Sequence, residues 1–284
     1  MIEWLVEPYA FAFMQRALLA LILVSVVGGV VGAFVVHKGL AFSGDALAHS
    51  TLAGIAIAFA SGGNVSLGAL AAAIVTALGI GWTRERARVS YDTAIGITFV
   101  AMFAFGILLI SRRTNYTPDL FSFVFGNILG VSQSDLVGAA ILAAALLVFV
   151  AATYREQLMV AYDPAMAAAA GVRTRFYQYA LLVMIAVAVV VAMKSIGIVL
   201  VNAMLIIPAA TASLVVRRLP TVMLLAIGFA LTSSVVGLQV SFYANVAASA
   251  AIVLVAAALF LGTLGVVNWT RRPSRQADAG KAAA

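Results

Sequence analysis

The sequence contains no cysteine, and charged residues make up only 10% of its 284 positions. The absence of cysteine excludes disulfide bonds and thiolate metal ligands within this chain. So few charges exclude an ordinary soluble globular domain, in which about 25% of residues are charged. There are only two histidines, His37 and His49, and the sequence has no HExxH, GxSxG or P-loop motif. No hydrolase or nucleotide-hydrolysing enzyme is therefore indicated.

Apolar residues are abundant instead, at 64% of the chain, and the mean hydropathy is +1.13. They form continuous runs of about 20 residues, the length that a helix needs to cross a bilayer. Such runs do not alternate as the strands of a membrane barrel do. We therefore predict an all-α polytopic membrane protein with about nine transmembrane helices, within a range of eight to ten. The predicted spans are 17–36, 40–60, 66–82, 92–111, 134–153, 176–194, 196–216, 221–240 and 245–268.

The remaining segments complete the predicted organisation. Segment 118–130 is too short to cross the bilayer, so we predict a re-entrant or interfacial helix there. Residues 1–270 are predicted to form a single transmembrane domain. Residues 271–284 are polar and low in complexity, so a disordered cytoplasmic tail is predicted. Because Glu3 and Glu7 replace a basic start, we expect no cleaved signal peptide.

The formal net charge is +7, and the basic residues lie in short clusters between the apolar runs. This distribution indicates membrane topology and argues against nucleic-acid binding. Thirteen basic residues fall in alternate loops on one side: Lys38, Arg84, Arg86, Arg88, Arg155, Arg173, Arg175, Arg217, Arg218, Arg271, Arg272, Arg275 and Lys281. The other side has four: Arg16, Arg112, Arg113 and Lys194. The positive-inside rule therefore predicts a cytoplasmic C-terminus and an external N-terminus.

The second predicted span carries two ionisable groups in its first half, Asp45 and His49. A carboxylate near the bilayer centre costs roughly 2.5 to 3.5 kcal/mol, so such groups usually face a bundle interior or a water-filled path. On a helix the two residues lie one turn apart on the same face. A carboxylate oxygen and an imidazole nitrogen so placed are candidate ligands for a divalent cation in transit.

The alternative interpretation is that Asp45 caps the start of the helix and His49 is a packed histidine with one internal hydrogen bond. Ser50 and, in the seventh span, Asn202 are further candidates for lining the same path. For Asn202 the alternative is a polar residue satisfied within its own helix.

The longest predicted cytoplasmic loop contains a short helix between Asp163 and Gly171. Asp163 suits the N-cap, Pro164 the first helical position and Gly171 the C-terminal stop. Ala167 and Ala168 give it small side chains that would fit closely into a groove. The helix is either a docking element for a partner protein or an ordinary surface helix.

Five motifs occur in the order seen in one protein family. They are GDALAHSTLAGIA (44–56), DTAIGI (92–97), FGNILGVSQSDL (125–136), DPAMAAAAGV (163–172) and SIGIVLVNAMLIIPAATA (195–212). Over roughly residues 12–268, the chain resembles the membrane subunit of bacterial ABC importers for zinc, manganese or iron(II).

This resemblance implies a non-catalytic permease subunit in the bacterial cell membrane that moves a divalent transition metal inward. The implied partners are a second permease chain, as a homodimer or with a close paralogue, two cytoplasmic ATPases, and an extracellular or periplasmic metal-binding protein. The chain itself would hold no cofactor, and ATP would bind the ATPases. Asp45 and His49 match the acid and the histidine of the family's second span. The helix at Asp163 to Gly171 is similar to its coupling helix.

Two other classes of function remain as alternatives. One is a secondary transporter or channel that uses Asp45 and His49 for ion or proton coupling. The other is an intramembrane enzyme, which the lack of a nucleophile and base pair disfavours. Only the ABC importer requires the helix at Asp163 to dock an ATPase, so co-purification with an ATPase would distinguish these functions.

Overall fold

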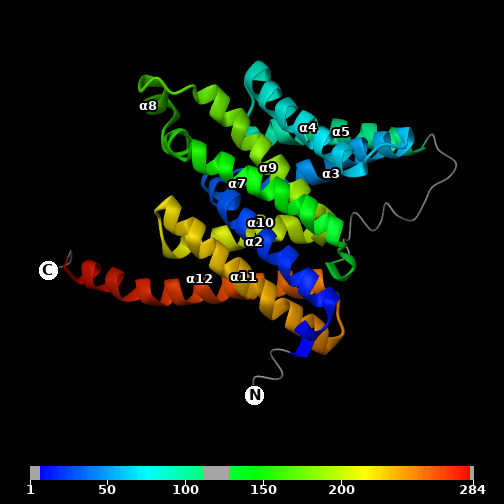
Figure 1. Ribbon diagram of the computed structural model, residues 1–284. Helices are drawn as coiled ribbons and strands as arrows, with labels where there is room; N and C mark the ends of the chain where they lie inside the picture. The colour runs from blue at the N-terminus through cyan, green and yellow to red at the C-terminus, as the bar shows by residue number, and fades with distance from the viewer. Residues whose placement is uncertain (1–6, 112–127, 282–284) are drawn as a thin grey trace.

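The computed structural model describes residues 7–111 and 128–281, and these residues are almost entirely helical (Figure 1). The nine long helices are α2 (Ala12–His37), α3 (Ala41–Ser61), α4 (Val65–Ala87), α5 (Tyr91–Ser111), α7 (Gln133–Tyr162), α9 (Thr174–Ile196), α10 (Ile198–Val215), α11 (Leu219–Ala244) and α12 (Ala248–Lys281). The short ones are η1 (Glu7–Ala10), η2 (Ile128–Gly130) and α8 (Pro164–Ala169). Each predicted span coincides with one long helix.

Eight of the long helices are long and apolar enough to cross a membrane, which confirms the predicted polytopic all-α fold. The remaining long helix, α3, is less apolar because it contains Asp45 and His49. It nevertheless packs against α4, α5 and α9 as a member of the bundle.

Two predicted segments differ from expectation or lie beyond the description. Most of the predicted re-entrant or interfacial helix at 118–130 lies outside the described residues. Its last three residues, Ile128–Gly130, are described and form a 3-10 turn. At the other end, α12 continues through residues 271–281, where the sequence predicts a disordered tail. The stretch contains Pro273 and Gly280, which disfavour a helix, so its composition does not explain this continuation.

The helices fall into two groups joined by a central pair. Helices α3, α4 and α5 pack on one another, and α10, α11 and α12 form a second group. Between the groups lie α2 and α9, with α7 against both of these (Figure 1). The candidate residues on α3 therefore lie at the junction of the first group with the centre of the bundle.

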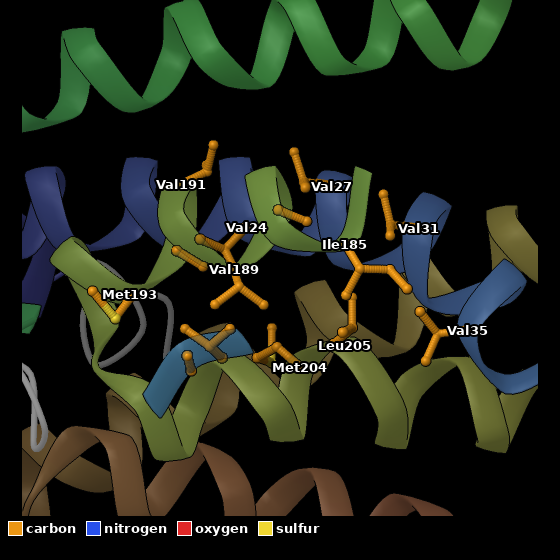
Figure 2. Packing of buried hydrophobic residues seen from close by; sticks show 14 of the residues in the cluster. Val24, Val27, Val31, Val35, Ile185, Val189, Val191, Met193, Met204 and Leu205 are labelled. Carbon is orange, nitrogen blue, oxygen red and sulfur yellow. The ribbon is translucent and has the colours of Figure 1, made fainter. Parts of the chain in front are cut away.

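The core is formed where α2 meets α9 and α10. One buried hydrophobic cluster joins these helices and includes Val27 and Val31 of α2, Ile185 of α9, and Met204 and Leu205 of α10 (Figure 2). These side chains are buried on all sides inside the bundle, as expected for helices packed within a membrane protein.

Glycine allows the closest of these approaches. A Cβ atom at Gly32 of α2 would collide with the backbone carbonyl of Leu205 on α10. Gly54 of α3 and Gly68 of α4 face each other in the same way, each against the other's carbonyl oxygen. Small residues commonly allow such backbone contact between helices in membranes.

The loops rich in basic residues meet at one end of the bundle. Lys38 Nζ, after α2, donates a hydrogen bond to the Val160 carbonyl near the end of α7 (2.7 Å). The hydroxyl of Tyr162, also on α7, donates to the carbonyl of Arg217 between α10 and α11 (3.4 Å). This is the end that the positive-inside rule assigns to the cytoplasm.

Candidate metal-binding site on α3

Asp45 and His49 lie together in the first half of α3. The N-cap position is Leu40, with no side-chain capping bond, and Asp45 is in the second helical turn. Asp45 is therefore not a helix cap. His49 Nδ1 lies 3.0 Å from the backbone oxygen of Asp45 and 3.5 Å from its carboxylate Oδ1. The predicted adjacency of the two side chains is present.

Both side chains lie on an exposed face of the chain. The side chain of Asp45 is 53% exposed and that of His49 is 30% exposed. The same face repeats every three or four positions and comprises Phe42, Asp45, His49, Leu52 and Ala56. A lipid-facing helix would not carry an acid and an imidazole at such positions. This face is suited to a water-filled path or to a second protein chain.

Asn202 of α10 contacts the same carboxylate. Its Nδ2 donates a hydrogen bond to Asp45 Oδ1 over 2.7 Å. Gly44 makes room for the amide, because a Cβ there would lie only 2.7 Å from Asn202 Oδ1. That Oδ1 atom is buried without a hydrogen-bond partner among the described residues. The amide thus fixes one oxygen of Asp45 and leaves Oδ2 for a ligand.

Two aromatic residues on α5 hold the imidazole. Phe99 and Phe103 each place a ring 5.9 Å from the ring of His49 in an edge-to-face arrangement. Such contacts restrict the rotation of His49. Because Nδ1 faces Asp45, Nε2 is the nitrogen that points beyond the pair. Sequence reasoning missed both phenylalanines, although their four-residue spacing on one helical face was a usable signal.

Ser50 lies on a different side of α3 from Asp45 and His49. It is fully buried, and its hydroxyl donates to the Leu47 carbonyl at 2.8 Å. A helix turns by about 100° per residue, so the neighbour of His49 faces elsewhere. Ser50 faces the packed interior of this chain, contrary to the prediction that it lines the path.

The described residues of one chain supply only two candidate metal ligands at this site. Among residues 7–111 and 128–281, no group of three or more histidine, cysteine, aspartate or glutamate residues is placed to hold a metal ion. Asp45 and His49 offer one oxygen ligand and one nitrogen ligand, fewer than zinc or manganese takes.

Comparison with known proteins identifies the family. The model of the ABC 3 transport family matches residues 10–266. The chain belongs to this family. It is 42% identical over 250 residues to the manganese transport system membrane protein MntC of Listeria innocua, covering 88% of this chain and 89% of that protein. It is 34% identical over 261 residues to a probable iron transport system membrane protein of Haemophilus influenzae, covering 92% and 96%.

A solved structure agrees with this assignment. PsaBC from Streptococcus pneumoniae in complex with Fab matches with a TM-score of 0.81 and 37% sequence identity, covering 93% of this chain and 95% of that one. The predicted resemblance is therefore confirmed, and the chain is a multi-pass membrane permease of the ABC 3 transport family.

The permease also has the short helix expected in its longest predicted cytoplasmic loop. Helix α8 begins at Pro164, and Asp163 Oδ1 accepts hydrogen bonds from the backbone amides of Ala165 (2.9 Å) and Met166 (3.0 Å). Gly171 follows the helix with φ of 81°, a left-handed conformation that glycine adopts without strain. The predicted cap, first residue and stop are all confirmed.

The outer face of α8 differs from the predicted one. Ala167 is fully buried against this chain, whereas Ala168 is exposed. Met166 is 68% exposed and was not recognised from the sequence. The face available to a partner therefore contains Met166 and Ala168, and Ala167 anchors the helix to α7 and α9.

Proposed function

We propose that this chain is the permease subunit of an ABC importer that carries a divalent transition metal, manganese, iron(II) or zinc, into the cell. The observation that supports this proposal is the pair of Asp45 and His49 on the exposed face of α3, with Asn202 of α10 hydrogen-bonded to Asp45. A carboxylate oxygen and an imidazole nitrogen are ligands that suit all three ions. The names of the manganese and iron relatives point to the same class of substrate.

A second copy of the chain completes the site. Two chains related by a two-fold axis through the exposed face of α3 would offer two Asp45 and two His49 side chains to one ion. Most side chains of helix α5, which carries Phe99 and Phe103, are not buried within this chain, and α5 would flank the same axis. Such a site binds the ion weakly enough to release it, as a translocation path requires.

The energy comes from partner chains. The sequence has no nucleotide-binding motif, so ATP binds two cytoplasmic ATPases that dock on α8. Figure 1 shows α8 at the end of the bundle, where α7 and α9 meet. An external metal-binding protein delivers the ion to the opposite end. The permease thus performs transport without catalysing a reaction itself.

The test is removal of each metal ligand. We expect Asp45→Ala and His49→Ala each to abolish uptake, because each takes away half of the ligands that one chain contributes. Membrane insertion and ATPase binding should persist, since each variant loses one partly exposed side chain and its local contacts with Asn202 or with Phe99 and Phe103, while the helix packing stays intact. Uptake of radioactive manganese and zinc into cells provides the measurement, with Ser61→Ala at the far end of α3 as the control. Near-normal uptake by both ligand variants would exclude this site.

A further inference from the structure

The turn between α2 and α3 is fastened to the end of α7. Lys38 Nζ donates to the Val160 carbonyl at 2.7 Å, and the ring of His37 lies 4.5 Å from the ring of Tyr162. The turn directly precedes the helix that bears Asp45. Val160 and Tyr162 directly precede the helix α8. Two contacts therefore join the start of the site helix to the base of the docking helix.

The sequence explains why the Val160 carbonyl is free for Lys38. In an α-helix this carbonyl would accept from the N–H of residue 164, four positions later. Residue 164 is proline, which has no N–H. The carbonyl also belongs to the last turn of α7, where the partial negative charge of the helix dipole attracts a cation. Lys38 supplies the hydrogen bond that Pro164 cannot.

Lys38 occupies a confined and electrostatically unfavourable position. Burial lowers the pKa of its ammonium group, and the positive Arg84 lowers it further. Arg84 is itself fixed in place, over the ring of Tyr91 at 3.9 Å and against Gln178 Oε1 at 3.3 Å. A lysine under these conditions would turn to solvent unless the carbonyl of Val160 retained it.

The turn is tightly connected to α3. Leu40 is 1% exposed, and its N–H donates to the Val35 carbonyl of α2 at 2.9 Å. The hydroxyl of Ser43 donates back to the Leu40 carbonyl at 2.6 Å. The backbone N–H groups of Lys38, Gly39 and Leu40 bond to carbonyls of α2, and the N–H and hydroxyl of Ser43 both bond to the Leu40 carbonyl. A displacement of Lys38 is passed to α3.

The junction between α7 and α8 is also continuous in hydrogen bonding. The N–H of Asp163 bonds to the Met159 carbonyl of α7 at 3.0 Å, while its side chain caps α8. No flexible linker separates α7 from α8, because one residue ends the first helix and starts the second. A displacement of α8 therefore moves Val160.

We propose that Lys38 is a positioning residue that couples α8 to the metal site. Movement of α8 by the ATPase pulls the Val160 carbonyl, the carbonyl pulls Lys38, and Lys38 shifts the start of α3 together with Asp45. This inference rests on the proposed function, since it assumes that α8 docks an ATPase and that α3 carries the ion.

The decisive variant is Lys38→Met, which keeps the apolar stem and removes the donor. With the complete transporter in vesicles, we expect the ATPase to co-purify normally and manganese to bind with an unchanged Kd. Uptake per ATP hydrolysed should be lost or sharply reduced, because the contact that passes the movement of α8 to α3 is removed. Lys38→Arg should restore coupling because it restores the donor. Arg86→Met, on the exposed end of α4, is the matched control.

A second variant tests the same contact while keeping a polar side chain in the turn. Lys38→Gln keeps a polar donor at this position, but its side chain is one bond shorter than that of lysine and carries no charge, so the bond to the Val160 carbonyl is lost. We expect the same loss of uptake per ATP, with ATPase binding retained. This variant decides the matter if Lys38→Met fails to insert.

The outcomes separate this inference from the proposed function. Normal coupling in Lys38→Met and Lys38→Gln, while Asp45→Ala blocks uptake, would overturn the role of Lys38 and leave the proposed metal site standing. Loss of coupling in both Lys38 variants, while Asp45→Ala transports normally, would support the role of Lys38 and exclude the proposed metal site at Asp45. Loss of ATPase binding in Lys38→Met that Lys38→Arg does not repair would show a purely structural role and overturn the inference.

Discussion

Replacing Asn202 with leucine tests whether Asp45, a proposed metal ligand, must be held in place by Asn202 to bind the ion. The two side chains have similar shape, so Asn202→Leu fills the same space beside Gly44 while removing the hydrogen bond to Asp45 Oδ1. Both metal ligands remain. The fold should tolerate the change, because it also removes an amide oxygen that is buried without a partner among the described residues.

The size of the effect follows from the bond that is lost. A hydrogen bond to a charged group contributes about 1.5 to 3 kcal/mol. Each 1.4 kcal/mol corresponds to about a tenfold change in Kd, so the Kd for manganese should rise by about 10- to 100-fold. Loss of a residue that orients a metal ligand typically weakens binding by a similar factor.

The assay is titration of manganese into the purified permease complex, followed by the loss of the free-ion electron paramagnetic resonance signal. Ser213→Ala is the control on the same helix, since its hydroxyl only bonds back to the Ala209 carbonyl at 2.8 Å. A Kd within about twofold of the unchanged protein would refute the reasoning, because Asp45 would then need no partner to bind the ion.

Two further predictions concern docking and packing. Ala168→Trp places a bulky ring on the exposed face of α8, so the ATPase should detach or hydrolyse ATP without transport. Co-purification of the ATPase and its hydrolysis in vesicles measure this effect, and Arg275→Ala in the tail should change neither. Full uptake by Ala168→Trp would show that α8 does not couple the ATPase to transport. Gly54→Val forces a side chain against the backbone of Gly68, so we expect a lower unfolding temperature and less folded protein in the membrane; Gly96→Val, where a Cβ meets nothing within 4 Å, should have little effect on either.

The nine long helices were predictable because each corresponds to one continuous apolar run, and the bilayer sets the length of such a run. The adjacency of Asp45 and His49 was predictable for a similar reason, since helix geometry alone brings residues four apart together. The cap at Asp163 and the stop at Gly171 likewise depend only on local sequence. Each of these features is fixed within a few residues of chain.

Features that depend on distant contacts were not predictable. Asn202 meets Asp45 across 157 residues of sequence, and nothing in either motif states that α10 packs on α3. The buried side of α8 depends on how a six-residue helix sits on α7 and α9, so the inward position of Ala167 could not be derived from its spacing. Ser50 is different, because its separation by one residue from His49 already implied another face.

The polar residues of the candidate site need protein or water around them rather than lipid, and the bundle provides these surroundings. Asp45 and His49 are polar groups of a kind that usually faces protein or water rather than lipid within a membrane. The neighbouring helices supply such protein surface, and the backbone contact of Gly54 with Gly68 pairs α3 closely with α4. The polar groups of the candidate site are thus compatible with the membrane because α3 packs within the bundle as part of a helical hairpin.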